Sequence, residues 1–181
     1  MSKPDDAELV AQCKRGNRRA FETLVLRYQK PVFNAALRML HSTDDASDIT
    51  QTVFLKVYEN LDTFDPAYKL FSWIYRIAMN ESINYLASKK RTGPLAVESE
   101  IEDESRNPEQ QLDGDILRGQ LRSALMNITP EYRMVIVLKH YLECSYSEIS
   151  EVLEISEKTV KSRLYTGRQL LRNQLTTGDL H

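Results

Sequence analysis

Basic and polar side chains gather between Ser156 and Leu175, and the chemistry that they suit is the binding of a polyanion. One acid, Glu157, stands in this stretch among five cations: Lys158, Lys161, Arg163, Arg168 and Arg172. At helical spacing the polar side chains fall opposite an apolar stripe made by Val160, Leu164, Leu170 and Leu171. A helix with one basic and one apolar face fits the groove of a nucleic acid.

A second helix start lies shortly before this one. Ser145 and Glu148 form an S-x-x-E capping box, and Ser156 offers the next N-cap. The apolar residues between the two caps also repeat at helical spacing, so the sequence predicts a helix-turn-helix. The same geometry occurs in helical bundles that do not touch DNA, and the basic face is what favours DNA here.

The positions on the second helix suggest separate roles in DNA recognition. Lys161 and Ser162 are best placed for base edges, and Tyr165 for a thymine methyl group or a sugar. The remaining cations, Lys158, Arg163 and Arg168, are placed for phosphates.

Aromatic and basic residues also alternate between Phe64 and Arg91. The aromatic members are Phe64, Tyr68, Phe71, Trp73 and Tyr75, and the basic ones include Arg76, Lys89 and Lys90. Aromatics at helical spacing usually belong to a core, whereas exposed rings beside cations form a platform for single-stranded DNA. Asn80 and Asn84 could hydrogen-bond a displaced base or could belong to a merely polar helix face.

A third polar group lies earlier in the chain, on the outside of a helix with a regular apolar stripe. Its members are Asp48, Gln51, Thr52 and Lys56. From the residue pattern alone, we interpret them as the solvent-exposed face of this helix.

Few residues suit catalysis or metal binding. His140 and Cys144 stand at i and i+4, but two ligands do not make a zinc site. The six glycines are scattered, and no phosphate-binding loop or hydrolase motif occurs. We expect no catalytic residue, no metal and no cofactor.

Helical periodicity extends through most of the chain and predicts an all-α protein with two small domains. Asp5 or Asp6 and then Asn17 are expected to cap the first two helices, Pro31 to kink or split the second, and Asp44 or Asp45 to start the third. A fourth helix is expected from about Leu70 to Lys90. The domains are residues 1–91, an N-terminal helical bundle, and residues 115–181, which carry the helix-turn-helix.

Residues 92–114 read as an acidic linker, because they contain few hydrophobic residues and no aromatic ones. The formal charge of the whole chain is −2, but this acidic stretch separates two basic segments. The 181 residues contain no signal peptide core and no long apolar run, so we expect a cytoplasmic protein. Cys13 and Cys144 fall in different predicted domains and read as packing residues.

Several motifs in this order resemble the extracytoplasmic-function (ECF) sigma factors of bacterial RNA polymerase. They are D-x-x-Q-x-x-F-x-x-x-Y from Asp48 to Tyr58, FSWIYRIAMN from Phe71 to Asn80, and YSEISEVL followed by TVKSRL. The resemblance covers nearly the whole chain. It implies a factor that is not an enzyme, directs core polymerase to promoters and helps to open DNA, under the control of an anti-sigma factor.

The resemblance also gives each group of residues a partner. Asp48, Gln51, Thr52, Phe54 and Lys56 would dock on the clamp helices of the polymerase largest subunit, and the C-terminal domain would contact the flap. The minus-ten element would be read as single strand, with Phe64 and Asn80 near a flipped base and with Tyr68, Trp73, Arg76, Asn84, Lys89 and Lys90 around them. The minus-thirty-five element would meet the C-terminal helix, and the linker would thread the polymerase cleft.

Two adjacent residues depart from the family pattern. Thr166 stands where relatives often have arginine, and Gly167 where they often have a small helix-forming residue, so we expect one contact fewer and a softer middle in this helix. The alternatives are a stand-alone helix-turn-helix regulator with an N-terminal interaction bundle and a small helical metalloenzyme.

Overall fold

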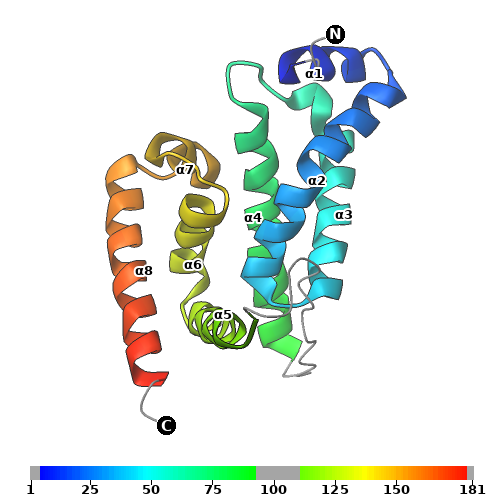
Figure 1. Ribbon diagram of the computed structural model, residues 1–181. Helices are drawn as coiled ribbons and strands as arrows, with labels where there is room; N and C mark the ends of the chain where they lie inside the picture. The colour runs from blue at the N-terminus through cyan, green and yellow to red at the C-terminus, as the bar shows by residue number, and fades with distance from the viewer. Residues whose placement is uncertain (1–4, 93–110, 179–181) are drawn as a thin grey trace.

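The computed structural model describes residues 5–92 and 111–178, and every regular element in these ranges is a helix (Figure 1). The all-α class is therefore confirmed. The N-terminal unit contains α1 (Asp6–Lys14), α2 (Arg18–Leu40), α3 (Thr43–Asn60), a 3-10 turn η1 (Leu61–Thr63) and α4 (Leu70–Thr92). The C-terminal unit contains α5 (Gln111–Met126), α6 (Pro130–Ile136), a π turn η3 (Val137–Tyr141), α7 (Tyr146–Leu153) and α8 (Glu157–Gly178).

The first two helices have the caps that the sequence predicts. The Asp5 carboxylate accepts from the Glu8 amide at 2.7 Å, and Asn17 caps α2 through the amides of Arg19 and Ala20. The helix α2 runs unbroken through Pro31, so the expected split does not occur. Loss of one backbone bond is tolerated in a helix of 23 residues whose inner face is buried.

The start of α3 differs from the expectation. Ser42, not Asp44 or Asp45, is the N-cap, and its Oγ accepts from the Asp45 amide at 3.2 Å. The two aspartates lie in the first turn, where their charge interacts favourably with the helix dipole. The helix α2 ends at His41, which has the left-handed conformation. Ser42 follows with the extended backbone that an N-cap adopts, so α3 begins directly after it.

Caps in the C-terminal unit confirm the helix-turn-helix. Ser145 Oγ accepts from the Glu148 amide at 3.1 Å, and the Glu148 carboxylate accepts from the Ser145 amide at 2.8 Å. Ser156 Oγ accepts from the Thr159 amide at 3.1 Å and starts α8. Thr129 precedes Pro130 at the start of α6, but its side chain makes no capping bond. The helix α5 begins at Gln111, four residues before the expected start, and residues 93–110 of the predicted linker lie outside the described residues.

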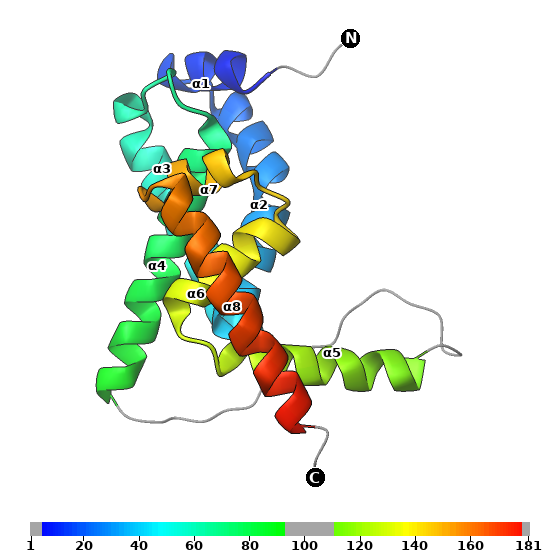
Figure 2. The same ribbon diagram turned by 90° about the vertical axis from the view of Figure 1, so that its left-hand side faces the viewer.

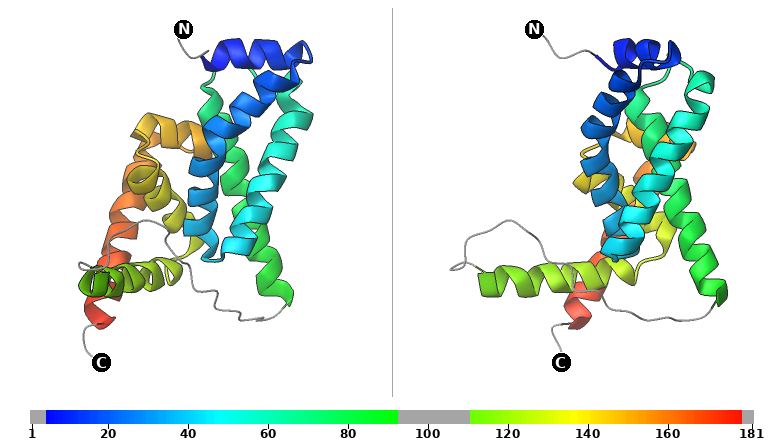
Figure 3. Two further views of the ribbon diagram at one scale, coloured as in Figure 1. Left: turned by 45° about the vertical axis from the view of Figure 1, so that its right-hand side comes forward. Right: turned by 90° about the vertical axis from the view of Figure 1, so that its right-hand side faces the viewer.

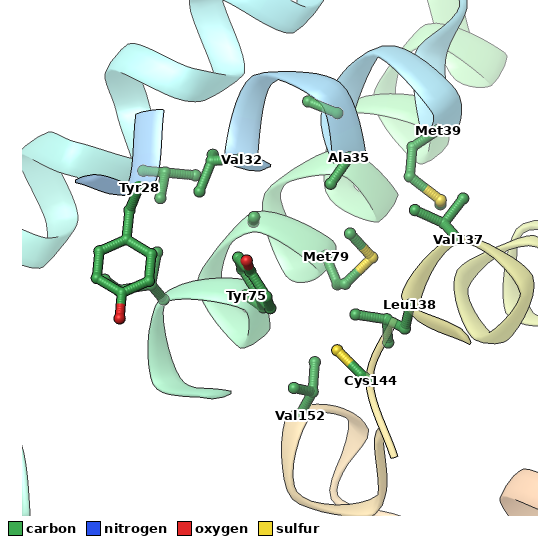
Figure 4. Close-up of a cluster of buried hydrophobic side chains, with 14 of the residues drawn as sticks. Tyr28, Val32, Ala35, Met39, Tyr75, Met79, Val137, Leu138, Cys144 and Val152 are labelled. Atoms are coloured by element: carbon green, nitrogen blue, oxygen red, sulfur yellow. The ribbon is translucent and has the colours of Figure 1, made fainter. Parts of the chain in front are cut away.

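The two units pack against each other along α2, α4 and α7, with α5 crossing the foot of the bundle (Figures 2 and 3). We call this contact the seam. Figure 4 shows its apolar centre: Val32, Ala35 and Met39 from α2 and Tyr75 and Met79 from α4 meet Val137, Leu138, Cys144 and Val152. The buried side chains of both units therefore form one continuous cluster.

A buried arginine ties the seam together. Arg133, 5% exposed, donates to the carbonyl oxygens of Leu125, Met126 and Ile128 in its own unit at 2.7–3.0 Å. Its Nη1 donates to the carbonyl oxygen of Met39, at the C-terminal end of α2. Burial lowers the pKa of Arg133 to about 10.

Candidate nucleic-acid interfaces

The outer face of α8 carries the side chains that the sequence assigned to duplex DNA. Lys158, Lys161, Ser162, Tyr165 and Arg168 are all exposed. The opposite face is anchored by Val160 and Leu164, which are fully buried, so the exposed face cannot turn inward. Arg163 differs from the others, since it is half-buried and faces Glu131 at 3.7 Å.

Gly167 has a packing role that the sequence did not show. A Cβ at this position would stand 3.1 Å from Ile136 Cδ1 and 3.5 Å from Tyr132 Cβ, both on α6. The missing side chain therefore lets α8 approach α6 closely, and the expectation of a merely softer helix is incomplete. A signal was present, because glycine 167 falls between Leu164 and Leu171 on the apolar side.

The His140 imidazole lies next to this helix. Its Nε2 faces Arg168 Nε at 3.4 Å, and burial followed by the charges of Arg168 and Lys139 lowers its pKa. Cys144 is buried in the seam, where burial raises the pKa of its thiol to about 11. Among residues 5–92 and 111–178, no three His, Cys, Asp or Glu side chains are grouped to hold a metal.

The aromatic residues between Phe64 and Tyr75 divide into buried and exposed members. Phe64 and Tyr75 are buried, at 6% and 8% exposed, and the Phe64 ring lies 5.2 Å from the ring of Trp73. Phe71 and Trp73 are half-buried, whereas Tyr68 is 56% exposed. In this arrangement Tyr68 offers a ring to solvent, and Phe64 supports the loop from inside.

A cavity of about 460 Å³ lies beside this loop, between it and α1. Its lining includes the apolar residues Val10, Phe64, Pro66, Leu70 and Phe71, together with Tyr68 and two lysines. One of them, Lys14, donates to the carbonyl oxygens of Asp62 and Phe64 at 3.2 and 3.1 Å, which holds α1 against the loop. Nothing in the spacing of α1 indicated that it would brace this segment.

The polar residues of α4 have different surroundings. Asn80, Asn84 and Lys90 are exposed. Lys89 is exposed as well and pairs with Asp45 at 3.3 Å. Arg76 instead turns to the other unit, where its two terminal nitrogens donate to the Glu154 carboxylate at 3.0 Å and to the Glu151 carbonyl oxygen at 2.6 Å.

The outer face of α3 holds two large exposed side chains that the sequence analysis did not assign to any site. Leu55 and Tyr58 are 62% and 63% exposed, next to exposed Asp48, Gln51 and Lys56. Thr52 is half-buried and Phe54 is buried, so Phe54 belongs to the core side of the helix. Leu55 could have been noticed, because it falls out of phase with the buried stripe through Val53 and Val57.

Known proteins resemble this chain over both units. Residues 24–92 match Sigma-70 region 2, and residues 118–171 match Sigma-70 region 4. The ECF RNA polymerase sigma factor SigW of Bacillus subtilis is 35% identical over 176 residues, which cover 92% of this chain and 94% of SigW. The ECF RNA polymerase sigma-E factor of Escherichia coli K12 is 31% identical, with 94% of each chain covered.

Solved structures agree with these sequence relationships. CnrH, solved in complex with the cytosolic domain of CnrY, is 27% identical, with a TM-score of 0.71 over 93% of this chain and 96% of that one. The sigma factor RpoE of Bartonella quintana, solved with the anti-sigma factor NepR, shares the fold at 20% identity, with a TM-score of 0.69 over 86% and 96% of the chains. The chain therefore belongs to the ECF sigma factors, the non-enzymatic initiation factors that direct RNA polymerase to its promoters.

Proposed function

We propose that this sigma factor holds core polymerase with the outer face of α3, the minus-ten strand with α4 and the preceding loop, and the minus-thirty-five duplex with α8. The observation that carries the proposal is the placement of α3 and α8. They lie on opposite sides of the molecule, so a protein partner and a DNA duplex do not compete for the same surface (Figure 1). This placement favours separate partners for the polar face of α3 and the basic face of α8.

Composition supports the protein partner at α3. Large exposed apolar side chains surrounded by polar ones are typical of a protein interface, where the apolar residues supply most of the binding energy. Leu55 and Tyr58 would be those residues, and Asp48, Gln51 and Lys56 would form the polar rim. Phe54 acts from beneath, because its buried ring sets the position of the helix.

For DNA, the exposed members of each predicted group are the direct contacts. Tyr68, Asn80, Asn84 and Lys90 would meet the single strand, with Phe64 and Trp73 shaping the loop that presents Tyr68. Arg76 and Lys89 would join them after leaving Glu154 and Asp45. On α8 the direct contacts would be Lys158, Lys161, Ser162, Tyr165 and Arg168, with Arg163 free to reach phosphate once it leaves Glu131.

A regulatory protein partner is part of the proposal. The similarity to CnrH, which was solved in complex with the cytosolic domain of CnrY, supports a protein partner. We propose that this partner is an anti-sigma factor that covers the polymerase-binding face. None of the described helices is long and apolar enough to span a membrane. We place the protein in the cytoplasm because its polymerase partner works there.

Run-off transcription with core polymerase across genomic promoters tests the function, and a matched pair of variants tests the α3 surface. Leu55→Asp should weaken core binding about tenfold or more, because it removes an exposed apolar anchor. Leu26→Asp is the control, since Leu26 on α2 is 70% exposed and carries the same chemistry. Equal core affinity of the two variants, measured by fluorescence anisotropy, would remove α3 from the interface.

A further inference from the structure

We infer that the place where the end of α2 meets the C-terminal unit is a binding site for a small phosphate-like oxyanion. It is separate from the surfaces of α3, α4 and α8 that the proposed function uses. The site brings together Arg38 and His41 at the end of α2, Arg122 on α5 and Arg133 on α6. We call these four residues the cationic junction. Guanidinium groups suit phosphate because each one presents a planar pair of N–H donors.

Packing between the two units places these side chains close together. Arg133 Nη1 donates to the carbonyl oxygen of Met39 in the last turn of α2. Cζ of Arg38, in the same turn, lies 4.7 Å from the centre of the Tyr141 ring in η3. The helix α5, which carries Arg122, passes the same end of α2 (Figure 1). The end of α2 is therefore in contact with three elements of the C-terminal unit.

Positive charge dominates the surroundings of His41. Burial, and then the charges of Arg122, Arg133 and Arg38, lower the pKa of its imidazole. No carboxylate is among the principal charges that act on this ring. None of the four side chains takes part in an ion pair within the ranges that the structure describes. Like charges gathered in a partly buried place lower stability unless a negative charge compensates them.

The acids that follow His41 in the chain do not supply this charge. Asp44 is exposed, and Asp45 pairs with Lys89 of α4 at 3.3 Å. Cations elsewhere in the N-terminal unit have acidic partners of this kind. Among the described residues the cationic junction has none, so its compensating charge would come from outside the chain.

Arg122 has a buried donor to offer to such a ligand. Its Nε is buried and has no hydrogen-bond partner among residues 5–92 and 111–178. Buried donors without an acceptor are rare in folded proteins and cost free energy. Arg133, by contrast, bonds carbonyl oxygens of its own unit at 2.7–3.0 Å and one at the end of α2. Contacts with helix ends therefore account for Arg133 but not for Arg122.

Burial of these donors limits the size of the ligand. Arg133 is 5% exposed and Nε of Arg122 is buried, whereas Arg38, His41 and Arg122 as whole residues are half-buried. A tetrahedral oxyanion can reach between half-buried side chains, but the surface of a duplex or a protein is too large to follow it. The site therefore suits inorganic phosphate or the phosphoryl group of a small molecule. The bound anion would bridge α2 and α5.

Thermal unfolding of the full chain in two salts tests the inference. With sodium phosphate at about ten times its dissociation constant, the thermal midpoint should exceed that in sodium chloride of equal ionic strength by about 3–6 °C. Arg122→Gln should lose most of this excess, because glutamine keeps a polar side chain but has no charge. Arg38→Gln should reproduce the loss, so that the result does not depend on the folding of one variant.

A matched variant separates site binding from the general effect of phosphate. Arg19→Gln removes the same charge from the exposed start of α2, at the other end of the helix from the cationic junction. Phosphate also stabilises proteins because it is excluded from their surface, and that effect is common to all variants. Arg19→Gln should therefore keep the full excess. An equal excess in Arg19→Gln, Arg122→Gln and Arg38→Gln, or none in the wild type, would overturn the inference.

The His41 imidazole gives a second, local readout. An anion beside the ring favours its charged form, so NMR titration should give a pKa at least about 0.5 higher in phosphate than in chloride of equal ionic strength. His140 is the internal control, because it faces Arg168 on α8 and should change less. A His41 pKa that is the same in both salts would show that no anion binds at the cationic junction.

Two further ligands identify the source of the oxyanion. Glycerol 3-phosphate replaces sodium phosphate in the same titration, and the tighter binder shows whether a small phosphorylated molecule or free phosphate suits the site better. A DNA duplex of mixed sequence is the other ligand. A rise in the His41 pKa with the duplex alone would assign the cationic junction to DNA and overturn the inference. Its failure leaves the proposed function untouched, since α3, α4 and α8 carry none of the four residues.

Discussion

Arg133 Nη1 donates to the carbonyl oxygen of Met39, 94 residues earlier in the chain, and so joins the C-terminal unit to the end of α2. The same guanidinium bonds three carbonyl oxygens of its own unit. One buried side chain therefore satisfies carbonyl oxygens in the turn between α5 and α6 and also forms a hydrogen bond across the seam.

Replacing Arg133 with lysine should lower the free energy of unfolding by about 2 kcal/mol, because one ammonium group cannot reach four carbonyl oxygens in this geometry. Urea unfolding followed by circular dichroism measures the change. Arg172→Lys on the exposed side of α8 is the control and should leave the midpoint within error. Equal midpoints for the two variants would show that the Arg133 bonds add no net stability.

His41 predicts a pH dependence of stability. Burial, and then the positive charges of Arg122, Arg133 and Arg38, lower its pKa from 6.5, so the folded chain takes up the proton less readily than the unfolded chain. The stability that neutral His41 contributes is thus present above pH 6.5 and is lost as the pH falls from there toward the pKa of His41 in the folded chain.

His41→Asn should flatten this part of the stability curve between pH 7.5 and 5.5, measured as thermal midpoints. Asparagine suits the left-handed backbone that His41 adopts at φ 56°, so the turn should survive. A variant that keeps the full wild-type slope would assign the dependence to another group.

Gly167→Ala should destabilise the C-terminal unit by about 1 kcal/mol, since the crowding against Ile136 exceeds the gain in helix propensity. Ile136→Val removes the Cδ1 atom that the new Cβ would meet, so the double variant should recover part of the loss. Gly119→Ala is the matched control on α5, where a Cβ meets nothing within 4 Å, and it should stabilise by about 0.5–1 kcal/mol.

Lys161→Ala should weaken binding of the holoenzyme to its minus-thirty-five element by about 1–3 kcal/mol and relax the sequence preference there. Its ammonium group is exposed above the ring of Tyr146 at 5.6 Å, free to turn toward a groove. Competition binding with mutated promoter sequences measures the preference. A smaller loss that is equal for all sequences would assign Lys161 to a phosphate.

Asn80→Ala should slow promoter opening while core binding stays unchanged, because Asn80 is exposed on α4 and not on α3. Permanganate footprinting of unpaired thymines measures opening, and anisotropy measures core binding. A fall in core affinity alone would place Asn80 in the polymerase interface.

Much of the fold could be predicted because it is encoded over short distances. The capping box of Ser145 and Glu148, the cap at Asn17 and the stripe that includes Val160 and Leu164 depend on residues within a few positions of one another. The motifs that resemble the ECF sigma factors lie within such helices, and the family assignment drawn from them is confirmed.

The seam, by contrast, depends on contacts between residues far apart in the chain. Periodicity shows that a helix has an apolar face, but it does not say which other helix covers that face. For this reason the sequence left the aromatic residues of 64–75 undivided, gave Glu148 only a capping role, and treated Gly167 as a weak point.

What the sequence by itself determined is the set of helices, most of their caps and the family to which they belong, because hydrogen bonds and side-chain spacing within a helix are local. Only the tertiary structure decided that Phe64 and Tyr75 are buried, that Tyr68 is exposed, and that Arg76 lies against Glu154. These differences in exposure follow from the way in which the apolar faces of the two units pack together. The same packing brings Arg76 and Glu154 into contact, although more than seventy residues separate them in the chain.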